Sequence, residues 1–341
     1  MKTRIITPDD TAGMLAAAET LRHGGLVAFP TETVYGLGGN ALDPAAAAKI
    51  YEAKGRPSDN PLIIHVNSID EAALYCEVCD LYERLYRHFL PGPLTVILPK
   101  RDNIPSEVTA GLDTVAVRIP SHPVARKLIS LSGIPVAAPS ANSSGRPSPT
   151  TALHVAEDLI GRIDFIIDGG SCDFGLESTI VKPEGNNRLT VLRPGAVTPE
   201  MLSKVCDEVT LAPSVTGFFR GTTPEAPGMK YRHYAPNLPV VILDGSGKEI
   251  ENFLSDKTNF GFLCFDEDMD IFQDRDDVVA ISMGGCSDYA AQAHRLFDCL
   301  RHFDEVEGID TIYARMPRRD GVSLAVFNRL VKAAGMDIRK L

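Results

Sequence analysis

Short apolar runs that alternate with helical patterns are the feature of this chain that most limits its fold. Over the first 205 residues, runs rich in Val and Ile predict strands, and helical patterns such as 8–23 and 43–53 separate several of them. This alternation is typical of an α/β fold with a mixed, twisted open sheet and flanking helices. The predicted strands are 26–29, 62–66, 94–98, 115–119, 136–138, 165–167 and 178–181.

The length of 341 residues predicts two domains, because it exceeds what one hydrophobic core usually supports. We expect a first domain over residues 1–205 and a linker over 206–237, where prolines interrupt the pattern. Residues 238–341 resume the alternation as a smaller, Rossmann-like α/β domain. Its predicted strands are 240–243, 261–265, 278–281 and 311–314, and no group of chemically reactive residues stands out in it.

Composition excludes several classes of protein. The net charge of -11 argues against sequence-independent nucleic-acid binding, which depends on neutralising phosphates. No apolar run approaches the roughly 20 residues that span a bilayer, and residues 1–7 lack the apolar core of a signal peptide. We therefore expect a cytoplasmic protein without membrane contact.

The seven cysteines do not suggest a disulfide framework, because their number is odd and their spacing is scattered. Cys76 and Cys79 have the spacing of a metal-binding or redox pair. They fall in a run, 72–89, whose pattern predicts a helix, and no second pair accompanies them. We expect no metal held by protein ligands.

A basic loop, residues 54–61 (KGRPSDNP), precedes the predicted strand 62–66. Pro57 and Pro61 prevent a helix there, so we expect Lys54 and Arg56 on an irregular segment anchored by the strand. Such a segment presents cations to phosphates or carboxylates. A solvated basic loop is the competing interpretation, and this loop alone does not decide between them.

Five further polar clusters lie at the ends of predicted strands, which is where open α/β sheets bind ligands. Glycines and small hydroxyl residues let backbone amides approach an anion, and arginines make planar two-point contacts. Each cluster alone has an ordinary structural explanation, but together they predict one anion-binding cleft. The clusters are 30–38 (PTETVYGLG), Arg118, 139–148 (PSANSSGRPS), 175–179 (GLEST) and 192–195 (LRPG). Neither a Gly-x-Gly-x-x-Gly nor a Walker-type loop is present.

These motifs, in this order, resemble the signature of the threonylcarbamoyl-AMP synthase family, in its two-domain form with a YrdC-type first domain. The resemblance implies a nucleotidyltransferase that condenses L-threonine, bicarbonate and ATP into L-threonylcarbamoyladenylate and pyrophosphate. That reaction is the first step of the threonylcarbamoyladenosine modification of ANN-decoding tRNAs. Mg²⁺ would arrive on the ATP phosphates, which it binds readily. A functional link to the tRNA threonylcarbamoyl-transfer complex follows, together with weak RNA contact.

The resemblance also implies roles for individual residues. The catalytic set is Lys54, Arg56, Ser140 and Asn142. The set that binds ATP is Arg56, Asn60, Thr114, Ser140, Ser148 and Arg193, with Tyr231, Arg232 and His233 as a lid. The set that binds L-threonine is Thr33, His65, Arg118, Ala138 and Ser178, with Arg118 pairing the α-carboxylate.

Two alternatives remain at this point. A related carbamoyl-transfer enzyme shares the first domain, but the zinc-finger cysteine pairs of such enzymes are missing here. A non-catalytic RNA-binding module is the other, and the acidic charge disfavours it.

Overall fold

Side-chain caps and prolines set the ends of several helices in this computed structural model, which describes residues 2–185, 187–216, 224, 226 and 233–341. The side chain of Asp43 accepts a hydrogen bond from the Ala45 amide at the start of α2 (Pro44–Lys54), and Pro44 fills the first turn. Gly55 ends that helix in the left-handed conformation (φ 61°), which a glycine adopts without strain. The helix predicted over 43–53 is thus confirmed.

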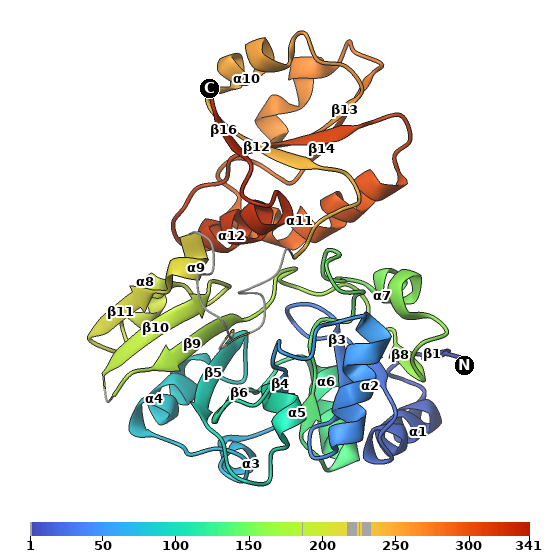
Figure 1. Cartoon of the computed structure of the whole chain (residues 1–341), viewed down its shortest axis with the longest axis vertical. Helices are drawn as coiled ribbons and strands as arrows, with labels where there is room; N and C mark the ends of the chain where they lie inside the picture. Colours follow the sequence, from blue (N-terminus) through green and yellow to red (C-terminus); the bar gives the residue numbers. More distant parts are fainter. Residues whose placement is uncertain (1, 186, 217–223, 225, 227–232) are drawn as a thin grey trace. The chain divides into compact units, whose positions relative to one another are not determined.

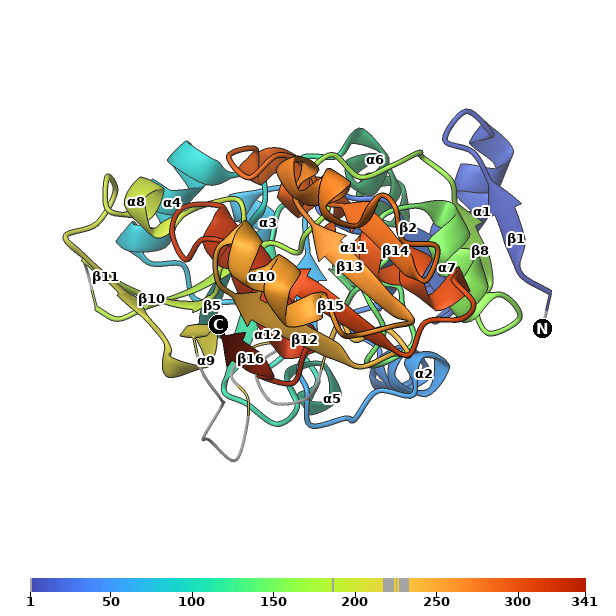
Figure 2. The ribbon, with the colours of Figure 1, turned by 90° about the horizontal axis from the view of Figure 1, so that it is seen from above.

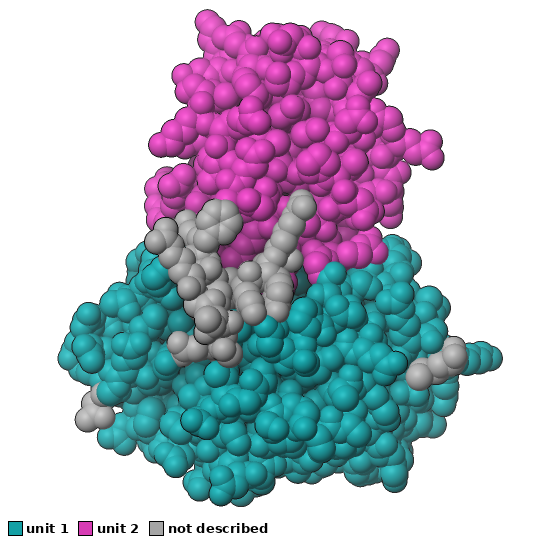
Figure 3. Space-filling model, viewed as in Figure 1, with its two compact units in different colours: residues 1–144, 148–230 teal, residues 145–147, 231–341 magenta. Residues whose placement is uncertain are grey.

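The chain divides into two compact units, which Figure 3 colours separately. One contains residues 1–144 and 148–230, and the other contains residues 145–147 and 231–341. We call them the N-terminal unit and the C-terminal unit, and Figure 1 gives the positions of their elements along the chain.

The N-terminal unit contains the larger of the two sheets. Its strands are β1 (Arg4–Ile6), β2 (Val27–Phe29), β3 (Gly36–Asn40), β4 (Ile63–His65), β5 (Leu94–Pro99), β6 (Thr114–Arg118), β7 (Val136–Ala137), β8 (Phe165–Ile167), β9 (Thr179–Pro183), β10 (Arg188–Arg193) and β11 (Glu208–Leu211). Its helices, besides α2, are α1 (Thr11–Arg22), α3 (Ile69–Ala72), α4 (Asp80–Phe89), α5 (Ser106–Thr109), α6 (Pro123–Ser132), α7 (Ala152–Leu159), α8 (Pro199–Leu202) and α9 (Pro213–Thr216).

Within the described residues, the strand order of this sheet is β1-β8-β2-β3-β7-β4-β6-β5-β9-β10-β11. Parallel pairs such as β4 with β6 and antiparallel pairs such as β5 with β6 occur side by side, so the sheet is mixed. Figures 1 and 2 show β1, β8 and α1 together at the N-terminal end of the unit. The predicted α/β class with a mixed sheet is confirmed.

Alternate residues of β2 face two different hydrophobic cores, as the two-residue period of a strand requires. Val27 and Phe29 pack with α1 and α6, whereas Ala28 belongs to the core that includes α2. Helices therefore cover both faces of this part of the sheet, and its strand ends are left to carry polar residues.

Three expectations about local structure need correction. Residues 72–89 are not one helix: α3 ends at Ala72, Cys76 pairs with Lys100 in an isolated bridge, and Cys79 precedes α4. Lys54 is the last residue of α2 and does not belong to the irregular loop. The segment expected to be a linker from residue 206 first forms β11, which pairs with β10, and then α9.

The C-terminal unit has a parallel sheet with the order β14-β13-β15-β12-β16 in the part of the chain that the structure describes. Its elements are β12 (Val240–Asp244), α10 (Gly247–Leu254), β13 (Phe260–Cys264), β14 (Val278–Ser282), α11 (Tyr289–His302), β15 (Thr311–Arg315), α12 (Ser323–Ala333) and β16 (Ile338–Lys340), with 3₁₀ turns at Asp266–Phe272 and Phe303–Glu305. Burial along nearly the whole length of β12 and β13 explains the continuous apolar runs of these two strands.

Candidate active site

Three polar side chains come together on neighbouring strands of the N-terminal unit. The register pairs His65 of β4 with Arg118 of β6, and it pairs Arg118 with Thr95 of β5. Residues that are opposite each other in a sheet project from the same face. All three are at most 4 % exposed, so they form a buried polar row across the sheet.

The guanidinium of Arg118 is only partly occupied by protein groups. Its Nη2 donates to Glu32 Oε1 at 2.7 Å, and the second oxygen of Glu32 accepts from the Ser121 amide at 3.3 Å. Arg118 Nε is buried and has no hydrogen-bond partner among the described residues. Because a buried donor without a partner is costly, this nitrogen marks a place for an acceptor from a ligand.

Hydroxyl groups continue the row beyond Arg118. Thr95 Oγ1 and Ser178 Oγ are 2.8 Å apart. Arg193 braces Ser178, because its Nε donates to the Ser178 carbonyl at 3.1 Å and its Nη2 to the hydroxyl at 3.2 Å. On the other side, Thr33 Oγ1 is 2.9 Å from Thr31 Oγ1. Arg193, expected at ATP, thus directly contacts Ser178, expected at threonine.

His65 is a neutral member of this row. Its Nδ1 donates to the Ile63 carbonyl at 3.2 Å, and its ring meets Phe29 edge-on. Burial, and next the positive charge of Arg118, lower the pKa of His65 to about 3. The imidazole therefore contributes hydrogen bonding and shape at neutral pH, and no charge. The amide of Ala138, also expected at threonine, donates to the Ile63 carbonyl at 2.8 Å.

Lys54 ties the end of α2 to the loop that follows β7. Its Nζ donates to the carbonyl oxygens of Ser140 and Asn142, both at 2.5 Å. Ser140 Oγ donates to Asn142 Oδ1 at 2.5 Å, and the Ser144 amide donates to the Lys54 carbonyl at 2.8 Å. Lys54 is 3 % exposed, so these bonds hold a cation and two polar side chains in one buried cluster.

The basic loop folds back on itself. Arg56 Nη2 donates to the carbonyl oxygens of Asn60 and Pro61 at 3.2 and 3.1 Å. Asn60 is 1 % exposed, and its side-chain oxygen has no hydrogen-bond partner among the described residues. Ser148, further along the β7 loop, donates to Glu177 Oε1 at 2.5 Å.

On β4 and β6, residues predicted to bind ATP and residues predicted to bind threonine lie toward opposite ends of the strands. Asn60 and Thr114 precede the paired residues Ile63 and Ala116, whereas His65 and Arg118 end the same two strands. Thr114 and Arg118 are four residues apart on one strand, or about 13 Å. Polar residues therefore lie at both ends of this strand pair.

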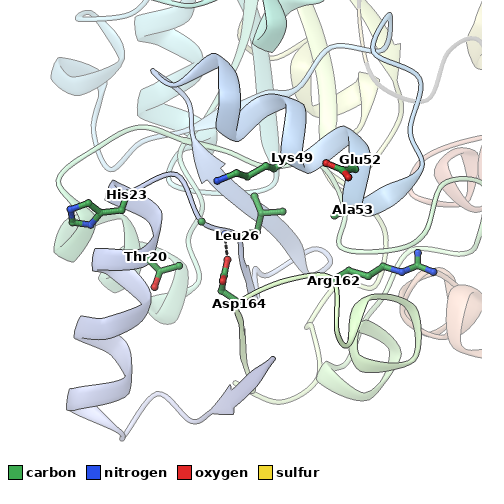
Figure 4. Close-up of a pocket in the computed structure, with 9 residues that line it drawn as sticks. Thr20, His23, Leu26, Lys49, Glu52, Ala53, Arg162 and Asp164 are labelled. Atoms are coloured by element: carbon green, nitrogen blue, oxygen red, sulfur yellow. Dashed lines mark hydrogen bonds between the residues drawn. The ribbon is translucent and has the colours of Figure 1, made fainter. Parts of the chain in front are cut away.

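An open pocket of about 710 Å³ lies elsewhere in the N-terminal unit, between the ends of α1 and α2 and the turn before β8 (Figure 4). Its polar groups hold its own walls together. Lys49 Nζ donates to the Gly24 carbonyl at 2.7 Å, and Asp164 Oδ2 accepts from the Leu26 amide at 2.8 Å. No predicted site residue lines it.

Sequence reasoning gave no role to Glu32, Thr95 or Glu177, although each contacts a predicted site residue. Glu32 lies inside the 30–38 motif, which was a usable signal, whereas Thr95 lies in an apolar strand that offers none. Of the predicted lid, Tyr231 and Arg232 lie outside the described residues. His233 belongs to the C-terminal unit, and its ring is tilted by 41° against that of Tyr234, with ring centres 5.6 Å apart.

The described residues contain no group of three or more His, Cys, Asp and Glu side chains suited to a metal ion. None of their helices is long and apolar enough to cross a membrane.

Fold and site together define a two-unit α/β protein whose larger unit contains buried polar side chains, among them the cations Lys54, Arg118 and Arg193. Comparisons with known proteins identify its family. Residues 19–195 match the family described as "Telomere recombination", and residues 197–335 match "Threonylcarbamoyl-AMP synthase, C-terminal domain". The chain belongs to the threonylcarbamoyl-AMP synthase family, as the sequence motifs predicted.

Relatives cover nearly the whole chain. Threonylcarbamoyl-AMP synthase of Pyrococcus abyssi is 45% identical over 95% of both chains. The Bacillus subtilis enzyme of the same name is 45% identical over 94% of this chain and 92% of its own. The crystal structure of P. abyssi Sua5 complexed with L-threonine matches with a TM-score of 0.90 and 44% identity, covering 99% of this chain and 100% of that one.

Proposed function

We propose that this protein condenses L-threonine, bicarbonate and ATP into L-threonylcarbamoyladenylate, with release of pyrophosphate. The observation that carries the proposal is the buried Arg118 guanidinium beside a row of hydroxyl groups, because its Nε has no acceptor in the part of the chain that the structure describes. Such a site suits the α-carboxylate and hydroxyl of threonine. A 44% identical relative, complexed with L-threonine, supports the same assignment.

The reaction has two steps in this proposal. The ammonium group of bound threonine first loses a proton to solvent. The uncharged amine then attacks the carbon of bicarbonate, which forms an N-carboxy group and releases water. An oxygen of that group then attacks the α-phosphorus of ATP, and the bond to pyrophosphate breaks. Catalysis of this kind rests on positioning and on stabilising negative charge.

The residues divide between the two substrates. Arg118, His65, Thr33 and Ser178 would hold threonine, with the backbone of Ala138 beside them. ATP would lie along a second set that meets the first at Ser178. That set is Lys54, Arg56, Asn60, Thr114, Ser140, Asn142, Ser148 and Arg193. Mg²⁺ bound to the phosphates would neutralise charge on pyrophosphate as it leaves.

The segment around residues 226–236 would act as a lid over the cleft, with Tyr231, Arg232 and His233 as its polar residues. Family resemblance motivates this role, and a lid would protect a labile intermediate from water. The product would pass to the tRNA threonylcarbamoyl-transfer complex, with only weak direct contact to RNA, given the net charge of -11.

The test is pyrophosphate release by the purified full-length protein, with each of the three substrates omitted in turn. We expect release only when threonine, bicarbonate and ATP are all present. Release that continues without threonine would contradict the proposed function.

A further inference from the structure

Glu32 contacts Arg118, which belongs to the buried polar row proposed to bind threonine, and the proposed reaction assigns no role to Glu32. Its side chain is 10% exposed and that of Arg118 is 5% exposed, so their ion pair is shielded from water. The backbone around Glu32 is fixed, since its carbonyl accepts from the Phe174 amide at 2.9 Å and Thr31 Oγ1 donates to the Val34 carbonyl at 2.6 Å. Glu32 is therefore held in place independently of Arg118.

The pair leaves the guanidinium incomplete. An arginine that only stabilises a fold tends to satisfy its buried donors, and a carboxylate can engage it through two parallel bonds. Here Glu32 engages Nη2, its other oxygen turns to the Ser121 amide, and Nε has no partner among the described residues. Glu32 thus fixes the orientation of the guanidinium and leaves Nε for a second acceptor.

The ion pair of Glu32 and Arg118 carries no net charge, and the next buried cation along the row is Arg193, which contacts Ser178. Arg118 contributes one positive charge and Glu32 one negative charge, while His65 is neutral because its pKa is lowered to about 3. A ligand carboxylate at Arg118 Nε would lie beside this neutral pair, and an ammonium group on the same ligand would compensate the added negative charge. A simple carboxylate would leave a net negative charge there, and a simple amine would leave a net positive charge.

We propose that Glu32 is the positioning and specificity residue of the amino-acid pocket: it orients Arg118 toward the ligand carboxylate and selects a ligand that carries an ammonium group as well. This inference rests on the proposed function, because it takes an amino acid to be the ligand at Arg118. The ligand class it assigns is a neutral α-amino acid, in preference to the same carboxylic acid without the amine.

The experiment is calorimetric titration of the full-length protein with L-threonine and with 3-hydroxybutyrate, which keeps the carboxylate and the hydroxyl but lacks the amine. The wild-type protein should bind L-threonine more tightly by roughly tenfold or more. Glu32→Gln removes the negative charge, so this preference should fall by roughly tenfold or reverse. Glu32→Asp keeps the charge and should retain the preference for threonine while binding both ligands less tightly.

Glu52→Gln is the matched control, because Glu52 is an exposed carboxylate on α2 outside the cleft, and its preference should equal that of the wild-type protein. An unchanged preference in a folded Glu32→Gln protein would overturn the proposal. If Glu32→Gln does not fold, equal affinity of the wild-type protein for the two ligands overturns it instead. Failure of the wild-type protein to bind L-threonine at all would count against the proposed function itself.

Discussion

The hydroxyl oxygens of Thr95 and Ser178 lie 2.8 Å apart, although 83 residues separate them in the chain. Thr95 is opposite Arg118 in the sheet, so it connects the proposed carboxylate contact to the proposed hydroxyl contact. This bond joins β5 to the residue before β9, which belongs to a distant sequence motif. It also brings a hydroxyl group from an apolar strand next to a residue proposed to bind threonine.

Thr95→Val should raise the KM for L-threonine roughly fivefold while changing kcat little, because the loss of a buried hydrogen bond costs about 1 kcal/mol. The expected cause is loosened positioning of Ser178, so Thr95→Ser should restore most of the affinity. Steady-state kinetics with threonine varied and ATP saturating measure the effect.

The control for this variant is Thr210→Val, since Thr210 Oγ1 makes a similar bond of 3.0 Å to Thr190, at an exposed position between β10 and β11. It should leave the KM for threonine unchanged. Equal effects of the two variants would remove Thr95 from the site.

Lys54→Met should weaken ATP binding roughly thirtyfold or more, which corresponds to about 2 kcal/mol. The variant removes the charge that holds the carbonyl oxygens of Ser140 and Asn142. Fluorescence titration with a labelled ATP analogue measures it. Lys49→Met provides the comparison, because Lys49 is on the same helix and bonds to Gly24 outside the cleft. Equal losses for the two lysines would mean that the helix, not the site, was damaged.

Arg56→Ala and Arg118→Ala should fail for different substrates. Arg118 belongs to the buried polar row that we propose binds threonine, so its loss should mainly raise the KM for threonine. Arg56 lies on the basic loop beside Asn60, so its loss should raise the KM for ATP mainly. Initial rates measured over a grid of both substrates separate the two effects. The division of the cleft is wrong if both variants affect both substrates equally.

Stability should depend on pH through His65. Its pKa is lowered from 6.5 to about 3, so its contribution is complete above pH 6.5 and is lost as the pH falls toward 3. Between about pH 7.5 and about pH 5, this residue should cost the native state about 2 kcal/mol. His65→Gln should therefore lose less unfolding free energy over that interval than the wild-type protein. Urea titrations at both pH values test this, and equal losses in the two proteins would show that His65 is not buried as a neutral group.

The lid predicts that a chain cut before residue 226 retains a folded N-terminal unit but has lower turnover. Circular dichroism checks the fold, and pyrophosphate release checks turnover. Undiminished turnover in the truncated protein would reduce the segment to a tether.

Local chemistry explains which parts of the fold were predictable. Asp43 followed by Pro44 marks a helix start on its own, and the structure has it. β3 was missed because its sequence, Gly36–Asn40, is rich in glycine, which is unfavourable in strands. Tertiary packing explains why glycine occurs in this strand, because a Cβ on Gly38 would lie 2.9 Å from atoms of both Phe29 and Val136. Contacts of this kind are fixed by strand pairing, which no local pattern contains.

The same distinction applies to the site. The sequence indicated Thr33, Arg118 and Ser140 because each belongs to a polar cluster at the end of a predicted strand, where open α/β sheets bind ligands. Glu32 lies inside the 30–38 motif, but its partner Arg118 is 86 residues away in the chain, and Thr95 became visible only with the sheet register. A single chain also gives no sign that Lys54 bonds to the loop after β7, because 86 residues separate it from Ser140.

The most direct test of the account is mass spectrometry of the product formed from L-threonine, ATP and ¹³C-bicarbonate. The account predicts an adenylate that contains the whole of threonine and one ¹³C atom, formed with pyrophosphate, and strongly reduced in Arg118→Ala. An adenylate without the ¹³C label, or one formed equally well by Arg118→Ala, would contradict it.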